Sequence, residues 1–189
     1  SSENTVSCSG STKDSLGLRI LTEPMITNSD RALIKWDNVE KATSYTVGLF
    51  EDLTCGKEVV SFLQAESEKS IGILRDGAYY VCVYAHFSDL PDKPAENNGV
   101  KIVIDRLSPR FDTKKPLPLK VMTGDKVSVY FADANLLSYN WELSSGPGDL
   151  IFSDQNNATT AINGDVAGAY QVAVTAVDSA GNLTTLLHV

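Results

Sequence analysis

Residues 74–85 read Leu-Arg-Asp-Gly-Ala-Tyr-Tyr-Val-Cys-Val-Tyr-Ala and show the clearest β-strand pattern in the chain. A turn signal, Asp76-Gly77, is followed by a run in which alternate side chains differ in character. Period-two alternation is typical of a β-strand with one buried face. One set of side chains is expected to face the core: Tyr79, Val81, Val83 and Ala85. The other set is expected to face outward: Tyr80, Cys82 and Tyr84.

Short apolar runs of this kind recur along the chain between clusters of Gly, Pro, Asn and Asp, and no helical period of useful length occurs. In the first half we predict strands at 18–22, 32–36, 44–50, 58–63, 70–74, 78–85 and 100–104. In the second half we predict strands at 119–122, 126–132, 138–143, 150–153, 159–162, 169–177 and 183–188. Many short strands with regular turn signals predict an all-β chain of two tandem antiparallel β-sandwiches.

Composition divides the chain into three parts. Residues 1–15 are rich in Ser and Thr and predict a flexible leader. Residues 16–108 hold the first sandwich, and the segment before Pro109 interrupts the strand pattern. Residues 109–189 hold the second sandwich.

Particular residues in both halves resemble known families. Trp36 on the second strand and the Tyr79–Ala85 run are similar to the fibronectin type III pattern. In the second half, Trp141 and the Ala169-Tyr170 corner resemble immunoglobulin domains, and 174–182 is similar to the last hairpin of PKD-like and bacterial Ig-like repeats. The resemblance implies tandem immunoglobulin-like repeats of a bacterial surface protein.

Such repeats imply a non-enzymatic adhesion or spacer module of a larger cell-surface or secreted protein, in an extracellular or periplasmic location. The expected partners are a cell-surface protein or glycan and the neighbouring domains of the parent chain. The alternative is an accessory pair of carbohydrate-binding modules from a secreted hydrolase.

Charge and motifs argue against other classes. The net charge is −8, and no Lys or Arg follows Lys126, so binding to nucleic acid is disfavoured. No apolar stretch is long enough for membrane insertion. The two histidines, His86 and His188, fall in different predicted domains, and no nucleophile or phosphate-binding motif occurs. We therefore expect no enzymatic activity.

The three cysteines predict one disulfide. Cys55 follows a turn-like segment and Cys82 lies inside a predicted strand, so a bridge between them would close a short loop in an oxidising compartment. The alternative is two buried thiols. Cys8 then remains as a free or intermolecular thiol in the leader.

Four aspartates at strand ends or near the domain junction are candidate calcium ligands: Asp105, Asp112, Asp133 and Asp178. Calcium prefers several oxygen ligands, which carboxylates supply. Aspartates at strand ends also form Asx turns, which need no ion. The sequence favours no bound cofactor, with calcium as the alternative.

A candidate binding face follows from strand parity. If the third, sixth and seventh strands are neighbours, four side chains form one exposed apolar patch: Phe50, Tyr80, Tyr84 and Val103. Such patches often contact proteins or sugars. The alternative is that a loop, the disulfide or the second domain covers them.

Overall fold

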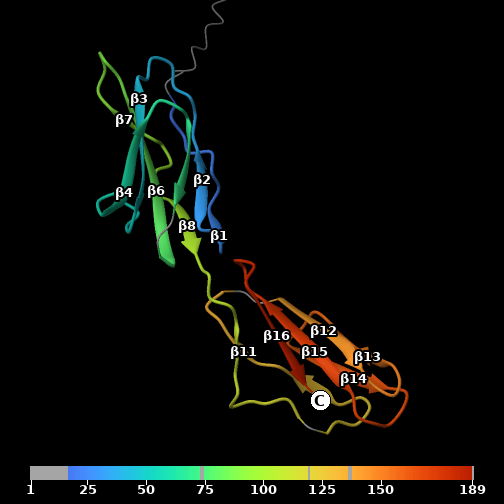
Figure 1. Cartoon of the computed structure of the whole chain (residues 1–189). Helices are drawn as coiled ribbons and strands as arrows, with labels where there is room; N and C mark the ends of the chain where they lie inside the picture. Colours follow the sequence, from blue (N-terminus) through green and yellow to red (C-terminus); the bar gives the residue numbers. More distant parts are fainter. Residues whose placement is uncertain (1–16, 73–74, 119, 136–137, 189) are drawn as a thin grey trace, which may run out of the picture. The chain divides into compact units, whose positions relative to one another are not determined.

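The computed structural model describes residues 17–72, 75–118, 120–135 and 138–188 (Figure 1). The predicted leader and Cys8 lie outside these residues. Strands are the only regular secondary structure among the described residues. These residues include no helix that is long and apolar enough to span a membrane. The chain divides into two compact units. Among the described residues, the first comprises 17–25, 30–72 and 78–102, and the second comprises 26–29, 75–77, 103–118, 120–135 and 138–188.

Eight strands occupy the first half: β1 (Met25–Thr27), β2 (Arg31–Lys35), β3 (Ser44–Phe50), β4 (Glu58–Gln64), β5 (Glu68–Gly72), β6 (Gly77–His86), β7 (Lys93–Pro94) and β8 (Val100–Ile104). One sheet has the order β1-β8-β6-β3-β4, with β7 paired to β6, and β2 pairs with β5 in a second sheet. The pairing of β3 with β4 and β6 and that of β2 with β5 are antiparallel.

Strand parity is confirmed in the core of this half. Val81, Val83 and Ala85 of β6 are fully buried. Two residues of the strand differ from the expectation: Tyr79 is only half-buried, and Cys82, expected to face outward, is fully buried. In the β3–β6 register, Tyr45 lies opposite Ala85. Its ring meets Trp36 edge-on at 5.7 Å. Alternate apolar side chains therefore hold the larger sheet against its partner.

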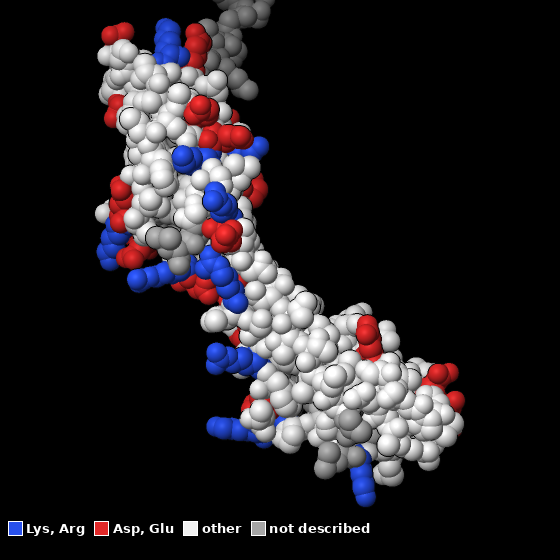
Figure 2. All heavy atoms as spheres, viewed as in Figure 1, with Lys and Arg blue, Asp and Glu red and all other residues white. Residues whose placement is uncertain are grey.

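Eight further strands follow: β9 (Arg110–Phe111), β10 (Lys126–Ser128), β11 (Phe131–Ala132), β12 (Ser138–Ser145), β13 (Leu150–Phe152), β14 (Thr159–Gly164), β15 (Gln171–Val177) and β16 (Leu183–His188). Two antiparallel sheets, β10-β14-β13 and β12-β15-β16, face each other, and β9 pairs with β11. Between them lies an apolar cluster: Leu117, Val127, Val129, Trp141, Phe152, Ile162, Val172 and Val174. Most of the surface of this unit in Figure 2 is uncharged. The fold is an all-β, antiparallel sandwich architecture, as predicted.

The predicted strand at 119–122 is wrong, because residues 120–122 join no strand. Pro116 and Pro118 lack the backbone N–H groups that a ladder needs. A cleft of about 1060 Å³ opens beside this segment, with Trp141 and Val172 among its lining residues.

Three strands were missed, β1, β7 and β9, and each has only two or three residues. The predicted strand at 18–22 is reduced to a single bridge between Ile20 and Trp36.

The tyrosine corner predicted at Tyr170 is present. Its hydroxyl donates a hydrogen bond to the Val166 carbonyl at 2.5 Å. The ring lies against Gly146, where an added Cβ would stand 2.1 Å from Tyr170 Cδ1. Gly146 is therefore required for steric reasons, because the tyrosine ring occupies the space of a side chain.

We predict that Gly146→Ala destabilises the second unit by about 1–3 kcal/mol, the usual cost of overpacking a well-filled site. Urea unfolding followed by Trp fluorescence measures the loss. Gly72→Ala is the matched control, because an added Cβ there meets no atom within 4 Å. Equal stability of the two variants would show that the Tyr170 ring does not occupy this position.

Candidate functional site

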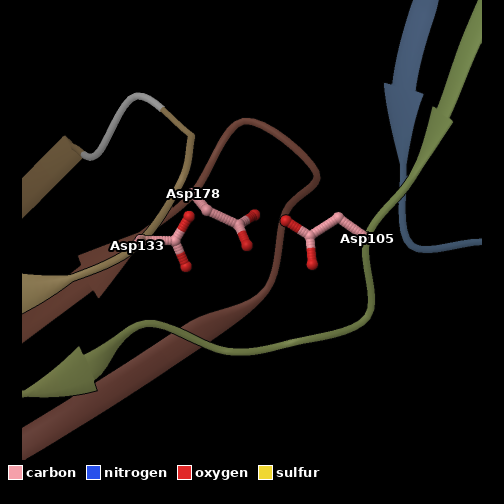
Figure 3. A group of neighbouring side chains, drawn as sticks. All are labelled: Asp105, Asp133 and Asp178. Atoms are coloured by element: carbon pink, nitrogen blue, oxygen red, sulfur yellow. The ribbon is translucent and has the colours of Figure 1, made fainter. Parts of the chain in front are cut away.

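Three of the four predicted aspartates form one cluster in the second unit (Figure 3). Asp105, Asp133 and Asp178 each offer a carboxylate oxygen, and these three oxygens lie within 4.8 Å of one another. Each aspartate directly follows a strand: β8, β11 and β15. The cluster therefore forms where the ends of three strands, remote in sequence, meet.

Asp178 is the most buried member, with 6% of its surface exposed. Its Oδ1 accepts hydrogen bonds from the backbone N–H groups of Ala180 at 2.8 Å and Asn182 at 2.9 Å. Its Oδ2 accepts one from the side-chain amide of Asn182 at 2.9 Å. These bonds offset the cost of burying a carboxylate, because each donor stabilises the charged form.

Asp105 and Asp133 are half-buried and are also fixed by short-range contacts. Asp133 Oδ1 accepts from the Asn135 backbone N–H at 2.7 Å, and Asp105 Oδ1 accepts from that of Leu107 at 3.0 Å. The Asn135 side-chain amide donates to Asp105 Oδ2. Both aspartates form the local turns expected of strand ends, and both still direct a carboxylate oxygen into the cluster.

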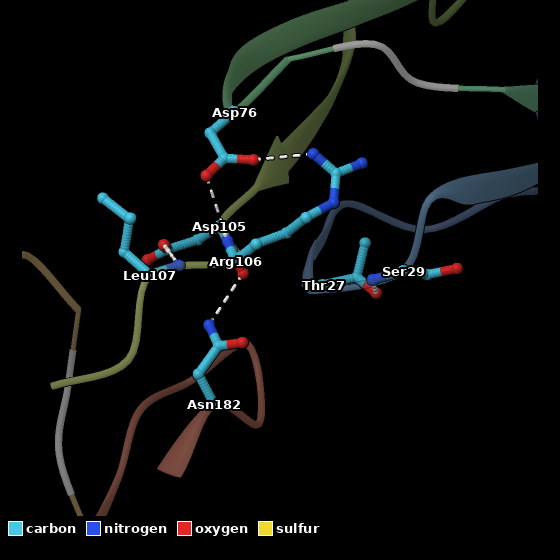
Figure 4. Close-up of polar contacts among 7 residues, drawn as sticks. All are labelled: Thr27, Ser29, Asp76, Asp105, Arg106, Leu107 and Asn182. Carbon is cyan, nitrogen blue, oxygen red and sulfur yellow. Dashed lines mark hydrogen bonds and ion pairs between the residues drawn. The ribbon is translucent and has the colours of Figure 1, made fainter. Parts of the chain in front are cut away.

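The backbone around Asp105 is anchored on two sides (Figure 4). Its carbonyl accepts a hydrogen bond from the Asn182 amide at 2.8 Å, and its N–H donates to the Thr27 carbonyl at 3.0 Å. The next residue, Arg106, forms an ion pair with Asp76 at 2.7 Å. This guanidinium is thus engaged by Asp76, and none of the ion pairs among the described residues involves the three clustered aspartates.

Asp112, the fourth predicted ligand, is not a member of the cluster. It follows β9, and its Oδ1 accepts a hydrogen bond from the Lys114 N–H at 3.0 Å. The ordinary Asx-turn interpretation is therefore the one that fits Asp112. Asn135 and Asn182, which connect the clustered aspartates, were missed by the sequence analysis. The signal was present, because each lies two or four residues after a candidate ligand.

The predicted aromatic face needs a correction at Phe50, which is 6% exposed and cannot be part of an exposed patch. Ladder pairing is irregular between Leu49 and Phe50. The Phe50 ring lies over Gly48, where an added Cβ would meet Phe50 Cε2 at 3.0 Å. Tyr80, opposite Phe50, and Tyr84, opposite Thr46, are half-buried on β6, as is Val103 on β8.

The disulfide between Cys55 and Cys82 is present, as predicted. Cys82 is fully buried opposite Gly48, so the bridge ties the 51–57 loop to the face that carries Phe50. Cys55 adopts a left-handed backbone with φ of 60°. The Asp52 carboxylate holds this loop, because it accepts hydrogen bonds from the Thr54 hydroxyl and from the Gly56 and Lys57 N–H groups.

The histidines serve local structure. His86 Nε2 lies 2.7 Å from the Thr46 hydroxyl, and Nδ1 lies 2.9 Å from Asp92. This hydroxyl–imidazole–carboxylate chain ties the segment before β7 to the middle of the sheet. His188 Nε2 lies 3.1 Å from the Pro118 carbonyl.

No family model and no curated protein matches the sequence. Among solved structures, the chain is similar to the fibronectin(III)-like modules of Clostridium thermocellum CbhA, with TM-score 0.46, 15% identity and 90% of each chain covered. It is also similar to Drosophila N-cadherin EC1-3, with TM-score 0.36 and 14% identity over 92% of this chain and 66% of that one. A third similarity is to Bacteroides uniformis beta-glucuronidase 3, with TM-score 0.30 and 12% identity over 90% of this chain and 24% of that one.

We predict that Asp52 titrates below its usual pKa of 3.8, because the Thr54 hydroxyl and then the Gly56 N–H stabilise its carboxylate. A lowered folded-state pKa adds stability that is present above the unfolded-state value and lost as the pH falls through the folded-state value. The 51–57 loop should therefore loosen only in strong acid. NMR titration of the Asp52 carboxyl measures its midpoint. Asp52→Asn should abolish the accompanying shift of the Gly56 amide, and a midpoint at or above 3.8 would contradict the assignment.

Proposed function

We propose that this chain is a non-enzymatic extracellular spacer or adhesion segment of a larger protein, and that calcium bound by Asp105, Asp133 and Asp178 stabilises it. The observation that carries the calcium part is the convergence of three carboxylate oxygens within 4.8 Å. The Cys55–Cys82 disulfide supports an extracellular location, because such bonds persist in oxidising compartments.

The chemistry of the cluster fits a hard cation. The three acidic side chains offer oxygen ligands only, with no thiolate or imidazole among them. Calcium accepts six to eight oxygens in a flexible geometry, so carboxylates, nearby carbonyls and water can complete its shell. Like charges held this close repel each other, and a divalent cation would convert that repulsion into attraction.

Bound calcium would have a mechanical consequence. Asp105 follows β8, Asp133 follows β11, and Asp178 opens the turn between β15 and β16. One ion would therefore join three chain segments that ladder hydrogen bonds leave unconnected at this end of the second unit. Cross-linking of this kind suits a module whose work is to hold its shape under load.

The spacer role is favoured over sugar binding by the aromatic side chains. Phe50 is buried, and Tyr80 and Tyr84 are half-buried. The predicted patch therefore exposes less aromatic surface than the strand alternation predicted. Of the three aromatic residues in the predicted patch, only Tyr80 and Tyr84 would then be available for an adhesive contact.

We predict that saturating calcium raises the melting temperature of the second unit by roughly ten degrees or more relative to chelator. A ligand at about one hundred times its Kd adds about 2.7 kcal/mol, and each kcal/mol shifts the melting temperature of a domain this size by about 4–8 °C. Differential scanning calorimetry of the whole chain measures the shift, with magnesium as the comparison ion.

Asp133→Asn should abolish the calcium-dependent shift, since it removes one charged ligand while keeping the shape of the side chain. Asp112→Asn is the matched control, because Asp112 also follows a short strand and lies outside the cluster. No shift in the wild-type chain, or equal loss in both variants, would contradict the calcium site and leave the spacer role without it.

A further inference from the structure

The strand β16 is an edge strand without a charged residue, a proline or a bulge, although the short strand β9 lies near it. Natural proteins protect edge strands from pairing by making them very short, by charging them, by bulges and prolines, or by covering them with another segment. β16 spans six residues, Leu183–His188, with no Asp, Glu, Lys, Arg or Pro. Its pairing with β15 is continuous from Leu183 to His188 without a register shift.

The other edge strands among the described residues are protected. β4 carries Glu58 and a register shift, and β12 carries Glu142 and a register shift. β2 and β5 hold charged residues along their length. The remaining edge strands have only two or three residues: β1, β7, β9, β10, β11 and β13.

The free side of β16 also presents unpaired backbone groups. The Asp178 N–H donates to the Asn182 carbonyl at 3.0 Å, so residues 178 and 182 form a hydrogen-bonded pair at the start of the β15–β16 hairpin. Because hydrogen-bonded and non-bonded pairs alternate in an antiparallel ladder, Thr184 and Leu186 turn their backbone groups toward β15. Leu183, Thr185 and Leu187 therefore direct theirs to the open edge. β9 comes close to β16 but does not join its ladder.

The side chains of the same three residues are exposed. Leu183 is 59% and Leu187 is 60% exposed, and Thr185 between them is also exposed. Their sequence is self-complementary about Thr185. In an antiparallel pair centred on this residue, Leu183 lies opposite the second copy's Leu187, and Thr185 lies opposite itself. Both pairs are hydrogen-bonded positions, and no like charges meet.

We propose that β16 pairs with β16 of a second copy of this chain about a twofold axis at Thr185, which joins two β12-β15-β16 sheets into one continuous sheet. We expect the partner to be a second copy because one register satisfies three requirements. In this register Leu183 meets Leu187, no like charges are opposed, and the outward backbone groups of the two strands face each other. A C2 interface requires this self-complementarity. The proposal is independent of calcium binding.

Disulfide trapping tests the register. The whole chain carries Cys8→Ser, so that the introduced cysteine is the only cysteine outside the Cys55–Cys82 disulfide. Thr185→Cys should form a covalent dimer on mild oxidation, at twice 20.4 kDa. Cα atoms of a hydrogen-bonded antiparallel pair lie about 5.5 Å apart, within the range that a disulfide spans. Leu183→Cys is the matched control, because four residues of offset separate the two copies of this position by roughly 13–14 Å.

Sedimentation velocity of the unmodified chain over a concentration series tests the association itself. We expect a concentration-dependent dimer that Thr185→Lys abolishes by placing two positive charges opposite each other. Asn140→Lys, in the same row of the sheet on β12, should leave the dimer unchanged. A chain that stays monomeric at every concentration, or equal crosslinking of Thr185→Cys and Leu183→Cys, would overturn the proposal.

Discussion

The buried carboxylate of Asp178 is the interaction on which the end of the second unit depends. Two backbone N–H groups and the Asn182 amide satisfy it, and that amide also holds the Asp105 carbonyl. The turn from 178 to 182, with Gly181 at φ of 89°, sets where β16 begins. Removing this carboxylate would release three donors at once, so its cost would spread to Asp105 and to the hairpin.

The turn that Asp178 stabilises contributes both to the proposed calcium site and to the proposed pairing of β16. On one side of the turn, Asp178 brings a buried charge beside Asp105 and Asp133, and a cation is the natural complement of that arrangement. On the other side, the turn fixes the phase of β16, so that Leu183, Thr185 and Leu187 direct their backbone groups outward. The turn is thus required for both features, although each feature is tested separately.

Much of the fold could be predicted because strand parity is a local property. The bounds of β3 and β8 match the prediction, and Val81, Val83 and Ala85 of β6 are buried as expected. The burial of Phe50 could not be predicted, because the irregular ladder pairing between Leu49 and Phe50 leaves no signal in the sequence. Strands of two or three residues, such as β7 and β9, are too short to show a period.

The candidate site divides in the same way. Sequence alone identifies aspartates at strand ends, and it selected Asp105, Asp133 and Asp178 together with Asp112. It could not separate Asp112 from the others, because which strand ends meet is decided by sheet pairing over long range. Calorimetric titration of calcium into the whole chain should show saturable binding of one ion per chain, and Asp133→Asn should remove it. The absence of any binding heat, together with unchanged NMR shifts of Asp105, Asp133 and Asp178, would show that the three aspartates hold no calcium.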